Sequence, residues 1–221
     1  MMAKCSTQLT LHELHQKKLL KRISGVSFLY PPFGEIIGQL SLALLQHQMP
    51  FQIYETYRTP ARQKKLISLG LSKIPDVMKS KHVHGLAIDV LLDYRAVRSL
   101  KKNKLSRITE SDINKKKDTI SDDYGGVYNL GVNMVESGAN APRTVVEDKV
   151  VLDFWNYLGK LIERQFPELV WGGTFNLKEG QLIGTDPPHI EYRYANEIMK
   201  QKRAIQVLKG RGNPGLEEIK V

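Results

Sequence analysis

The architecture of this chain is set by one segment, Ser80-Lys81-His82-Val83-His84-Gly85-Leu86-Ala87-Ile88-Asp89. Within it, Gly85 permits a tight backbone turn. After that turn every second position is apolar, as at Leu86, Ile88 and Val90. A period of two with β-branched residues is typical of a buried strand, here one that carries Asp89 on one face. We therefore expect His82 on the loop that enters the strand and Asp89 within it, both pointing into one cleft.

His82 and Asp89 offer a ring nitrogen and a carboxylate oxygen, which are good zinc ligands, but a catalytic zinc site usually has three protein ligands. The third is best sought in Gly184-Thr185-Asp186-Pro187-Pro188-His189-Ile190-Glu191-Tyr192. There His189 can be the third ligand and Asp186 the general base. The two prolines between them hold the segment extended, which keeps the base and the ligand at a fixed separation.

These residues form the pattern Ser-x-His-x-x-Gly-x-Ala-x-Asp, followed far downstream by Asp-x-x-His. The pattern resembles the zinc peptidases that cut bacterial peptidoglycan, a family of D-alanyl-D-alanine carboxypeptidases, vancomycin-resistance dipeptidases and phage L-alanyl-D-glutamate endopeptidases. Tyr57-Arg58-Thr59-Pro60-Ala61-Arg62-Gln63 resembles the family's Tyr-Arg-Ser/Thr-Pro block, whose arginine lies in the active site. Trp171-Gly172-Gly173-Thr174-Phe175 resembles the Trp-Gly-Gly-Asp-Trp block of the endopeptidase branch. The resemblance spans about residues 51 to 192.

The resemblance implies a zinc peptidase that holds one Zn²⁺ per chain through three side chains, His82, Asp89 and His189. It assigns proton transfer to Asp186 and stabilisation of the oxyanion to Arg58. Contacts with the substrate are expected from Ser80, Trp171 and Tyr57. Several alternatives stay open: Arg58 pairs with Glu55 on the surface, Ser80 caps a loop, or Trp171 packs beneath the zinc loops. His84 is a rival to His82, but the family spacing favours His82.

Two features favour the endopeptidase branch: Asp186, where the other branches more often carry Glu, and the Trp171-Gly172-Gly173 block. The expected substrate is then the L-alanyl-D-glutamate bond of the peptidoglycan stem peptide, and the expected role is that of a phage endolysin. One alternative is a D-alanyl-D-alanine carboxypeptidase or dipeptidase. A second is a non-catalytic cell-wall-binding module on the same fold.

The predicted fold is α+β, a small antiparallel sheet flanked by helices, with the zinc site in a cleft on the sheet. We expect one peptidase domain over residues 1–221, with its core at about 24–194. A charged insertion covers about 93–148, and a basic helix and a loose tail cover 195–221. Apolar spacing predicts helices over 8–23, 34–48, 60–70, 150–165 and 195–209, and strands over 51–57, 86–91 and 169–171.

The net charge of +10 indicates an anionic partner. We expect anionic envelope polymers besides the stem peptide, and no nucleic acid, because no nucleic-acid-binding motif is present. The single cysteine, Cys5, excludes an internal disulfide and a cysteine zinc cluster. No signal peptide and no membrane span are visible. We expect a monomer, made in the host cytoplasm and acting on the cell wall after release.

Overall fold

The computed structural model describes residues 18–92, 149–179, 181 and 183–220. Its helices and strands follow one another as η1 (Val26–Phe28), α2 (Pro31–Gln46), β1 (Phe51–Glu55), α3 (Pro60–Ser68), η2 (Val77–Lys79), β2 (Ala87–Leu92), α6 (Lys149–Gln165), β3 (Leu169–Trp171), η6 (Gly172–Thr174), β4 (His189–Tyr192), α7 (Ala195–Lys200) and α8 (Arg203–Gly210). The predicted insertion at 93–148, Cys5 and most of the predicted helix at 8–23 lie outside the described residues.

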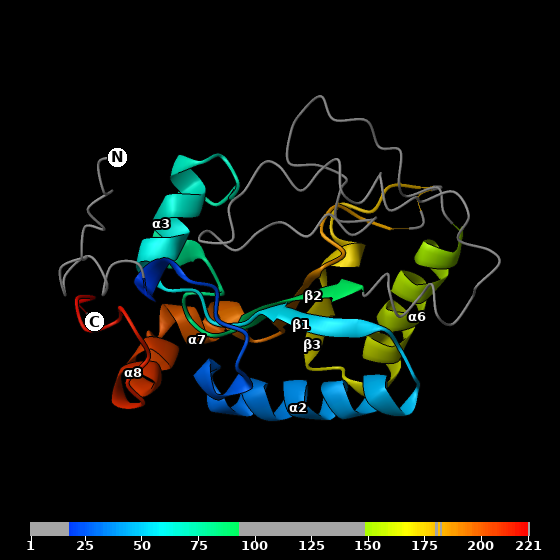
Figure 1. Cartoon of the computed structure of the whole chain (residues 1–221), viewed down its shortest axis with the longest axis horizontal. Helices are drawn as coiled ribbons and strands as arrows, with labels where there is room; N and C mark the ends of the chain where they lie inside the picture. The colour runs from blue at the N-terminus through cyan, green and yellow to red at the C-terminus, as the bar shows by residue number, and fades with distance from the viewer. Residues whose placement is uncertain (1–17, 93–148, 180, 182, 221) are drawn as a thin grey trace, which may run out of the picture.

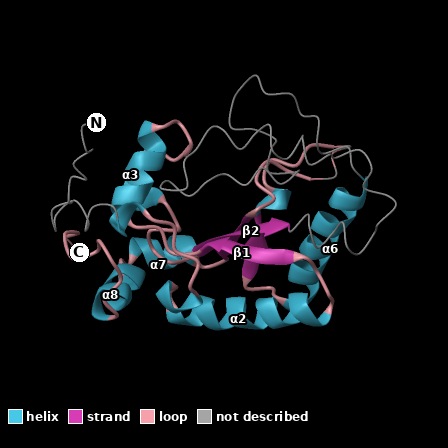
Figure 2. Ribbon diagram, viewed as in Figure 1, coloured by secondary structure: helices cyan, strands magenta, loops and turns pink. Residues whose placement is uncertain are grey.

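Four strands form one antiparallel sheet in the order β1-β2-β4-β3. Helix α2 runs along one face of this sheet, α6 stands at one end, and α3, α7 and α8 lie at the other end (Figure 1). Figure 2 shows how little of the described chain is strand compared with helix. The α+β class and the small antiparallel sheet are thus confirmed.

The main core lies between the sheet and the helices α2 and α6. On β2 the alternate residues Ile88, Val90 and Leu92 are at most 1% exposed, so the predicted alternation is confirmed. They belong to the same cluster as the buried residues of two helices. These residues are Phe33, Ile37, Leu40, Ala43 and Leu44 on α2, and Trp155, Leu158, Leu161 and Ile162 on α6. The opposite face of the sheet, which carries Asp89, is therefore left for the functional side chains.

Local signals explain where the helices begin. Pro31 starts α2, because a proline at the first helical position loses no backbone hydrogen bond. The side chain of Thr59 accepts a hydrogen bond from the backbone N–H of Arg62 and caps α3, with Pro60 at the first position as predicted. The strand β1 ends at Glu55, two residues earlier than the sequence predicts.

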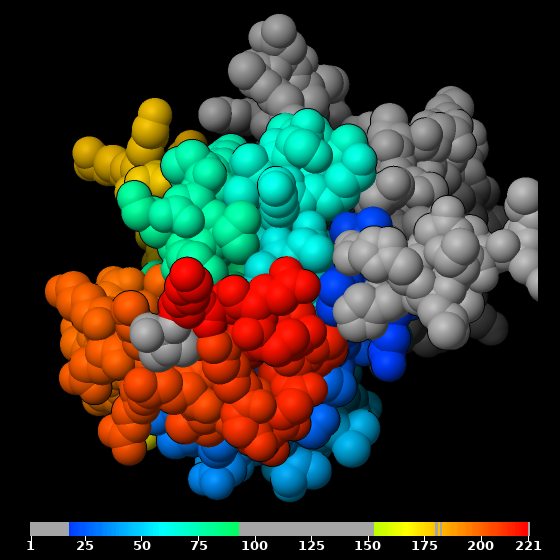
Figure 3. Space-filling view, turned by 90° about the vertical axis from the view of Figure 1, so that its left-hand side faces the viewer, coloured from blue at the N-terminus to red at the C-terminus, as the bar shows by residue number. Residues whose placement is uncertain are grey.

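The C-terminal segment differs from expectation. The predicted helix over 195–209 is two helices, because Lys202 between α7 and α8 takes a left-handed conformation with φ of 52°. The tail is not loose: Leu216 is fully buried, and the side-chain amide of Asn213 donates to the carbonyl of Phe28 at 2.8 Å. Figure 3 shows this segment lying across the surface between α8 and α3. Packing against the body therefore orders a terminal segment that is expected to be loose.

Candidate metal centre

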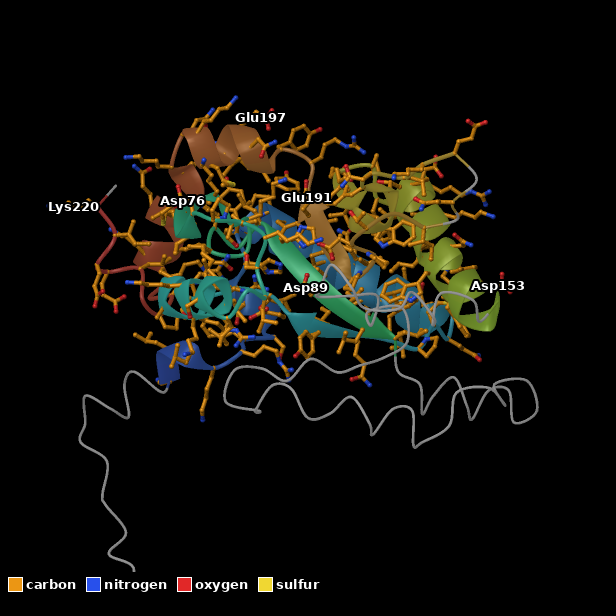
Figure 4. All side chains as sticks on the ribbon, turned by 90° about the horizontal axis from the view of Figure 1, so that it is seen from above. Asp76, Asp89, Asp153, Glu191, Glu197 and Lys220 are labelled. Carbon is orange, nitrogen blue, oxygen red and sulfur yellow. The ribbon has the colours of Figure 1, made fainter. Side chains whose placement is uncertain are left out.

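Strand register aligns three functional groups in one row across the sheet. Asp89 of β2 lies opposite His189 of β4 on one side and opposite Glu55 of β1 on the other. An irregularity in the β1–β2 pairing between Ile53 and Glu55 brings Glu55 into this row. Because side chains alternate across a strand, all three groups share the face that α2 leaves open. In Figure 4 Asp89 lies at the centre of this face.

The main chain around His82 is fixed by hydrogen bonds to its carbonyl. The backbone N–H groups of Arg58 and Gly85 donate to it at 3.1 Å and 3.0 Å. Gly85 has a φ of +62°, and a Cβ there would lie 3.0 Å from the backbone nitrogen of Tyr30. The turn that places His82 beside β2 therefore depends on a glycine at this position.

His82, Asp89 and His189 bring one ligand atom each within 4.8 Å of one another. Asp89 Oδ1 is 3.3 Å from His82 Nε2 and 3.3 Å from His189 Nδ1. Ligand atoms bound tetrahedrally at zinc distances lie about 3.3–3.6 Å apart. These three residues can therefore hold a metal ion, and the predicted ligand set comes together in the structure.

The remaining ring nitrogens of both histidines have partners that fix the tautomer. His82 Nδ1 lies 2.9 Å from the carbonyl oxygen of Thr56, which can only accept, so this nitrogen donates. His189 Nε2 lies 3.1 Å from Glu191 Oε2. The ring nitrogens that face Asp89 then carry lone pairs, and these lone pairs repel the lone pairs of its carboxylate oxygen. A proton or a metal cation between the nitrogens and the oxygen removes this repulsion. This outer arrangement is usual for metal-binding histidines.

The electrostatics of the site favour positive charge between its ligands. Burial alone would lower the pKa of His189, but hydrogen bonds to Asp89 and Glu191 outweigh it and raise this pKa to about 10. Burial would raise the pKa of Asp89, but the neighbouring His82 charge, the histidine hydrogen bonds and Arg58 hold it well below its usual range. The Asp89 carboxylate is therefore ionised and suited to a cation.

Arg58 is held in place by two carboxylates and one amide side chain. Its Nη2 contacts Asp89 Oδ2 at 3.2 Å and also Glu55, its Nε donates to Glu55 at 3.0 Å, and its Nη1 donates to Gln63 at 2.9 Å. Arg62 reaches the other oxygen of Glu55 at 2.5 Å. The alternative pairing with Glu55 is therefore present, and the arginine also contacts Asp89, whereas its role towards an oxyanion stays a prediction. One Nη1 N–H has no partner among the described residues.

The loop that carries Asp186 and His189 rests on a second loop at the end of β3. Asp186 N donates to the carbonyl of Gly172 at 3.3 Å, and His189 N donates to that of Asp186 at 3.1 Å. A Cβ at Gly172 would overlap the carbonyl oxygen of Asp186, so only glycine fits. Trp171 Nε1 donates to the carbonyl of Pro187 at 2.7 Å. The Trp-Gly-Gly block therefore supports the segment that carries Asp186 and His189.

Asp186 is exposed, but the surrounding protein desolvates its carboxyl group and raises its pKa. Electrostatic interactions with His189, His82 and Lys73 oppose this rise in the pKa of Asp186, whereas the negative charge of Asp89 adds to it. Asp186 therefore shares the electrostatic environment of the three ligands. A carboxyl group with a raised pKa beside a metal site suits proton transfer.

The three predicted substrate-binding residues all have buried side chains. Tyr57 is fully buried and its hydroxyl donates to the carbonyl of Pro214 at 2.8 Å. Trp171 is 7% exposed and packs beneath the loop, which was the second alternative for it. Ser80 is fully buried, and its hydroxyl has no partner among the described residues. Tyr57 and Trp171 pack inside the protein and Ser80 has no exposed surface, and the substrate contacts of these residues stay predictions.

His84, the rival ligand, is 3% exposed and turns away from the centre. Its Nε2 lies 2.8 Å from the carbonyl oxygen of Met78. Burial lowers its pKa, so it is a neutral side chain packed in the turn. The preference for His82 as the ligand therefore agrees with the geometry.

Three contributors to the site lack an assignment from the sequence. Thr56 binds His82 through its backbone carbonyl, and a backbone contact cannot be predicted from the residue type. Phe175 stands beside His189, with 6.1 Å between the ring centroids. Lys81 pairs with Glu191, a residue 110 positions away, at 2.6 Å. Only the position of Lys81 next to a ligand histidine could have suggested its role.

Comparisons with protein-family models, with curated proteins and with solved structures found no match to this chain. The family resemblance therefore stays a prediction based on motifs. Among the described residues, no helix is both long enough and apolar enough to cross a membrane.

Proposed function

We propose that this protein is a zinc-dependent peptidoglycan endopeptidase that hydrolyses the L-alanyl-D-glutamate bond of the stem peptide. The observation that carries the proposal is the meeting of His82, Asp89 and His189 around one point, with the carboxyl group of Asp186 in the same electrostatic environment. Two histidines, one carboxylate and a separate acid–base group are the parts that metal-assisted amide hydrolysis requires.

In this proposal His82 Nε2, Asp89 Oδ1 and His189 Nδ1 hold the ion. When bound, Zn²⁺ supplies a Lewis acid that polarises the scissile carbonyl and acidifies water. Asp186 accepts a proton from the attacking water and delivers it to the leaving amine nitrogen. The raised pKa of Asp186 favours the first of these transfers, because it makes the carboxylate a stronger base for the water proton.

Arg58 has two functions in the proposal. It fixes Asp89 through the contact at 3.2 Å, and Glu55 and Gln63 keep its guanidinium in place. The remaining Nη1 N–H is available to the substrate carbonyl oxygen, where a fixed positive charge stabilises the charge that develops in the transition state. A preorganised arginine of this kind needs no rearrangement during the reaction.

The choice of bond follows from the sequence motifs. Asp186 and the Trp171-Gly172-Gly173 block resemble the endopeptidase branch, and both lie at the candidate site. The second candidate, a D-alanyl-D-alanine carboxypeptidase or dipeptidase, uses the same ligands. The surplus of positive charge supports an anionic envelope as the place of action.

Digestion of purified peptidoglycan tests the proposal. The muropeptides are analysed by mass spectrometry with and without a chelator, and with Asp186→Ala as the inactive control. A new free L-alanine carboxyl end that depends on zinc supports the endopeptidase. Loss of terminal D-alanine means a carboxypeptidase. Binding to the wall without any released product means a non-catalytic module and ends the proposal.

A further inference from the structure

A lysine connects the two segments that carry the metal ligands. Lys81 Nζ lies 2.6 Å from Glu191 Oε1, and Glu191 Oε2 lies 3.1 Å from His189 Nε2. The two carboxylate oxygens of Glu191 are thus divided between the lysine and the ligand histidine. Figure 4 shows Glu191 beside Asp89 on the face that carries the site.

The backbone leaves this chain of contacts little freedom. The N–H of Leu86 donates to the carbonyl of Lys81 at 2.9 Å, and the N–H of Tyr192 donates to the carbonyl of Leu86, also at 2.9 Å. In the next row of the sheet, Ala87 lies opposite Glu191. The turn that holds His82 and the strand that holds His189 are therefore in fixed register where Lys81 meets Glu191.

We propose that Lys81 is a positioning residue that orients His189 as a metal ligand by holding the carboxylate of Glu191. The inference rests on the metal site of the proposed function. With Lys81 in place, Glu191 presents Oε2 to His189 Nε2, which keeps the proton on that nitrogen and directs the Nδ1 lone pair to the ion. Without the lysine, the carboxylate is free to rotate towards water, and His189 loses its fixed orientation.

An ordinary surface ion pair would contribute little here. The Lys81 and Glu191 side chains are only 22% and 12% exposed, and the pair touches a ligand directly through Glu191. Lys79, two residues earlier, is exposed and ends the short helix η2. It offers a matched control, because its removal takes away the same charge from the same loop and leaves Glu191 untouched.

The test measures zinc affinity of the metal-free protein by competition with a chromophoric chelator, independently of any activity. Lys81→Met is expected to weaken zinc binding about tenfold, at the low end of the range for partners of metal ligands. Lys81→Arg should restore most of the affinity, and Lys79→Met should leave it unchanged. Glu191→Ala should weaken binding about 10- to 100-fold, and adding Lys81→Met to it should cost nothing more.

The outcomes separate this inference from the proposed function. Zinc affinity unchanged in Lys81→Met, or a full additive loss in the double variant, overturns the positioning role while the proposed function stands. Weakened affinity in Lys81→Met with no cleavage of peptidoglycan by the wild type overturns the proposed function alone. A wild type that binds no zinc overturns both. Should Lys81→Met fail to fold by circular dichroism, Lys81→Gln replaces it with the same expected result.

Discussion

Two segments supply the candidate metal centre, and they are built differently. Residues 80–89 form a turn and a central strand, where Ser80 and Ile88 are fully buried and His82 is 4% exposed. Residues 184–188 form a loop that rests on another loop and leads to His189, the first residue of β4, and both Thr185 and Asp186 are exposed. The first segment belongs to the core of the protein, whereas the loop of the second lies at the protein surface.

The difference suggests a division of labour between the segments. A ligand pair in a rigid strand and turn keeps the ion in one position, as preorganised catalysis requires. In the proposed function, the acid–base group Asp186 stands on the more open side, where substrate and water would enter and leave. Variants in the first segment should therefore affect metal binding and stability, and variants in the loop before His189 should affect turnover.

Asp89→Ala is expected to have the largest effect. Asp89 touches both ligand histidines and Arg58, so its removal takes away a ligand and the group that aligns the other three side chains. We expect no measurable zinc binding and no cleavage. Isothermal titration with zinc and the muropeptide digest measure this, with the exposed Asp153→Ala on α6 as control. Zinc binding at wild-type affinity would contradict the assigned ligand set.

Asp186→Asn should separate chemistry from metal binding. The amide keeps the size of the side chain but cannot accept the proton, and loss of general acid–base catalysis costs about 10²- to 10⁴-fold in turnover. Zinc affinity should stay at the wild-type value, because Asp186 is not a ligand. The measurement is the rate of muropeptide release beside a zinc titration. Turnover close to that of the wild type would remove Asp186 from the mechanism.

The first segment could be predicted from the sequence because its signals are local. The alternation at Leu86, Ile88 and Val90 fixes which face of β2 is buried, and Asp89 must then lie on the other. The turn at Gly85 follows from residue type. The motif spacing could identify His189 as a ligand, although the short strand β4 that places it has no clear pattern of its own.

What the sequence could not predict depends on contacts between distant residues. Leu216 is buried against a cluster that includes Tyr57 and Ile205, so the C-terminal segment is ordered although a terminal segment is expected to be loose. Tyr57 is fully buried in the same cluster. The support of Asp186 by Gly172 likewise joins backbone atoms of two loops, which no side-chain pattern records.

A pair of glycine variants sharpens the comparison between the segments. Gly85→Ala places a side chain at φ of +62°, which costs about 1–2 kcal/mol before the crowding against Tyr30 is added. We expect a lower free energy of unfolding of the metal-free protein. Gly172→Ala instead displaces the carbonyl of Asp186, so turnover should fall more than stability. Urea unfolding and digest rates measure both, and the reverse pattern would contradict the division of labour.

The smallest expected effect concerns two tryptophans that differ in their hydrogen bonds. Trp171 Nε1 donates to the carbonyl of Pro187, whereas the buried Nε1 of Trp155 has no partner among the described residues. Replacing either with phenylalanine removes the same atoms, but only Trp171→Phe leaves a carbonyl without its donor. The lost bond should lower the free energy of unfolding by about 0.5–1.5 kcal/mol relative to Trp155→Phe. It should also slow the digest, because Pro187 follows Asp186 directly. Equal stabilities and equal rates for the two variants would mean that the loop does not depend on this bond, and that the support of the base lies in the glycine contacts alone.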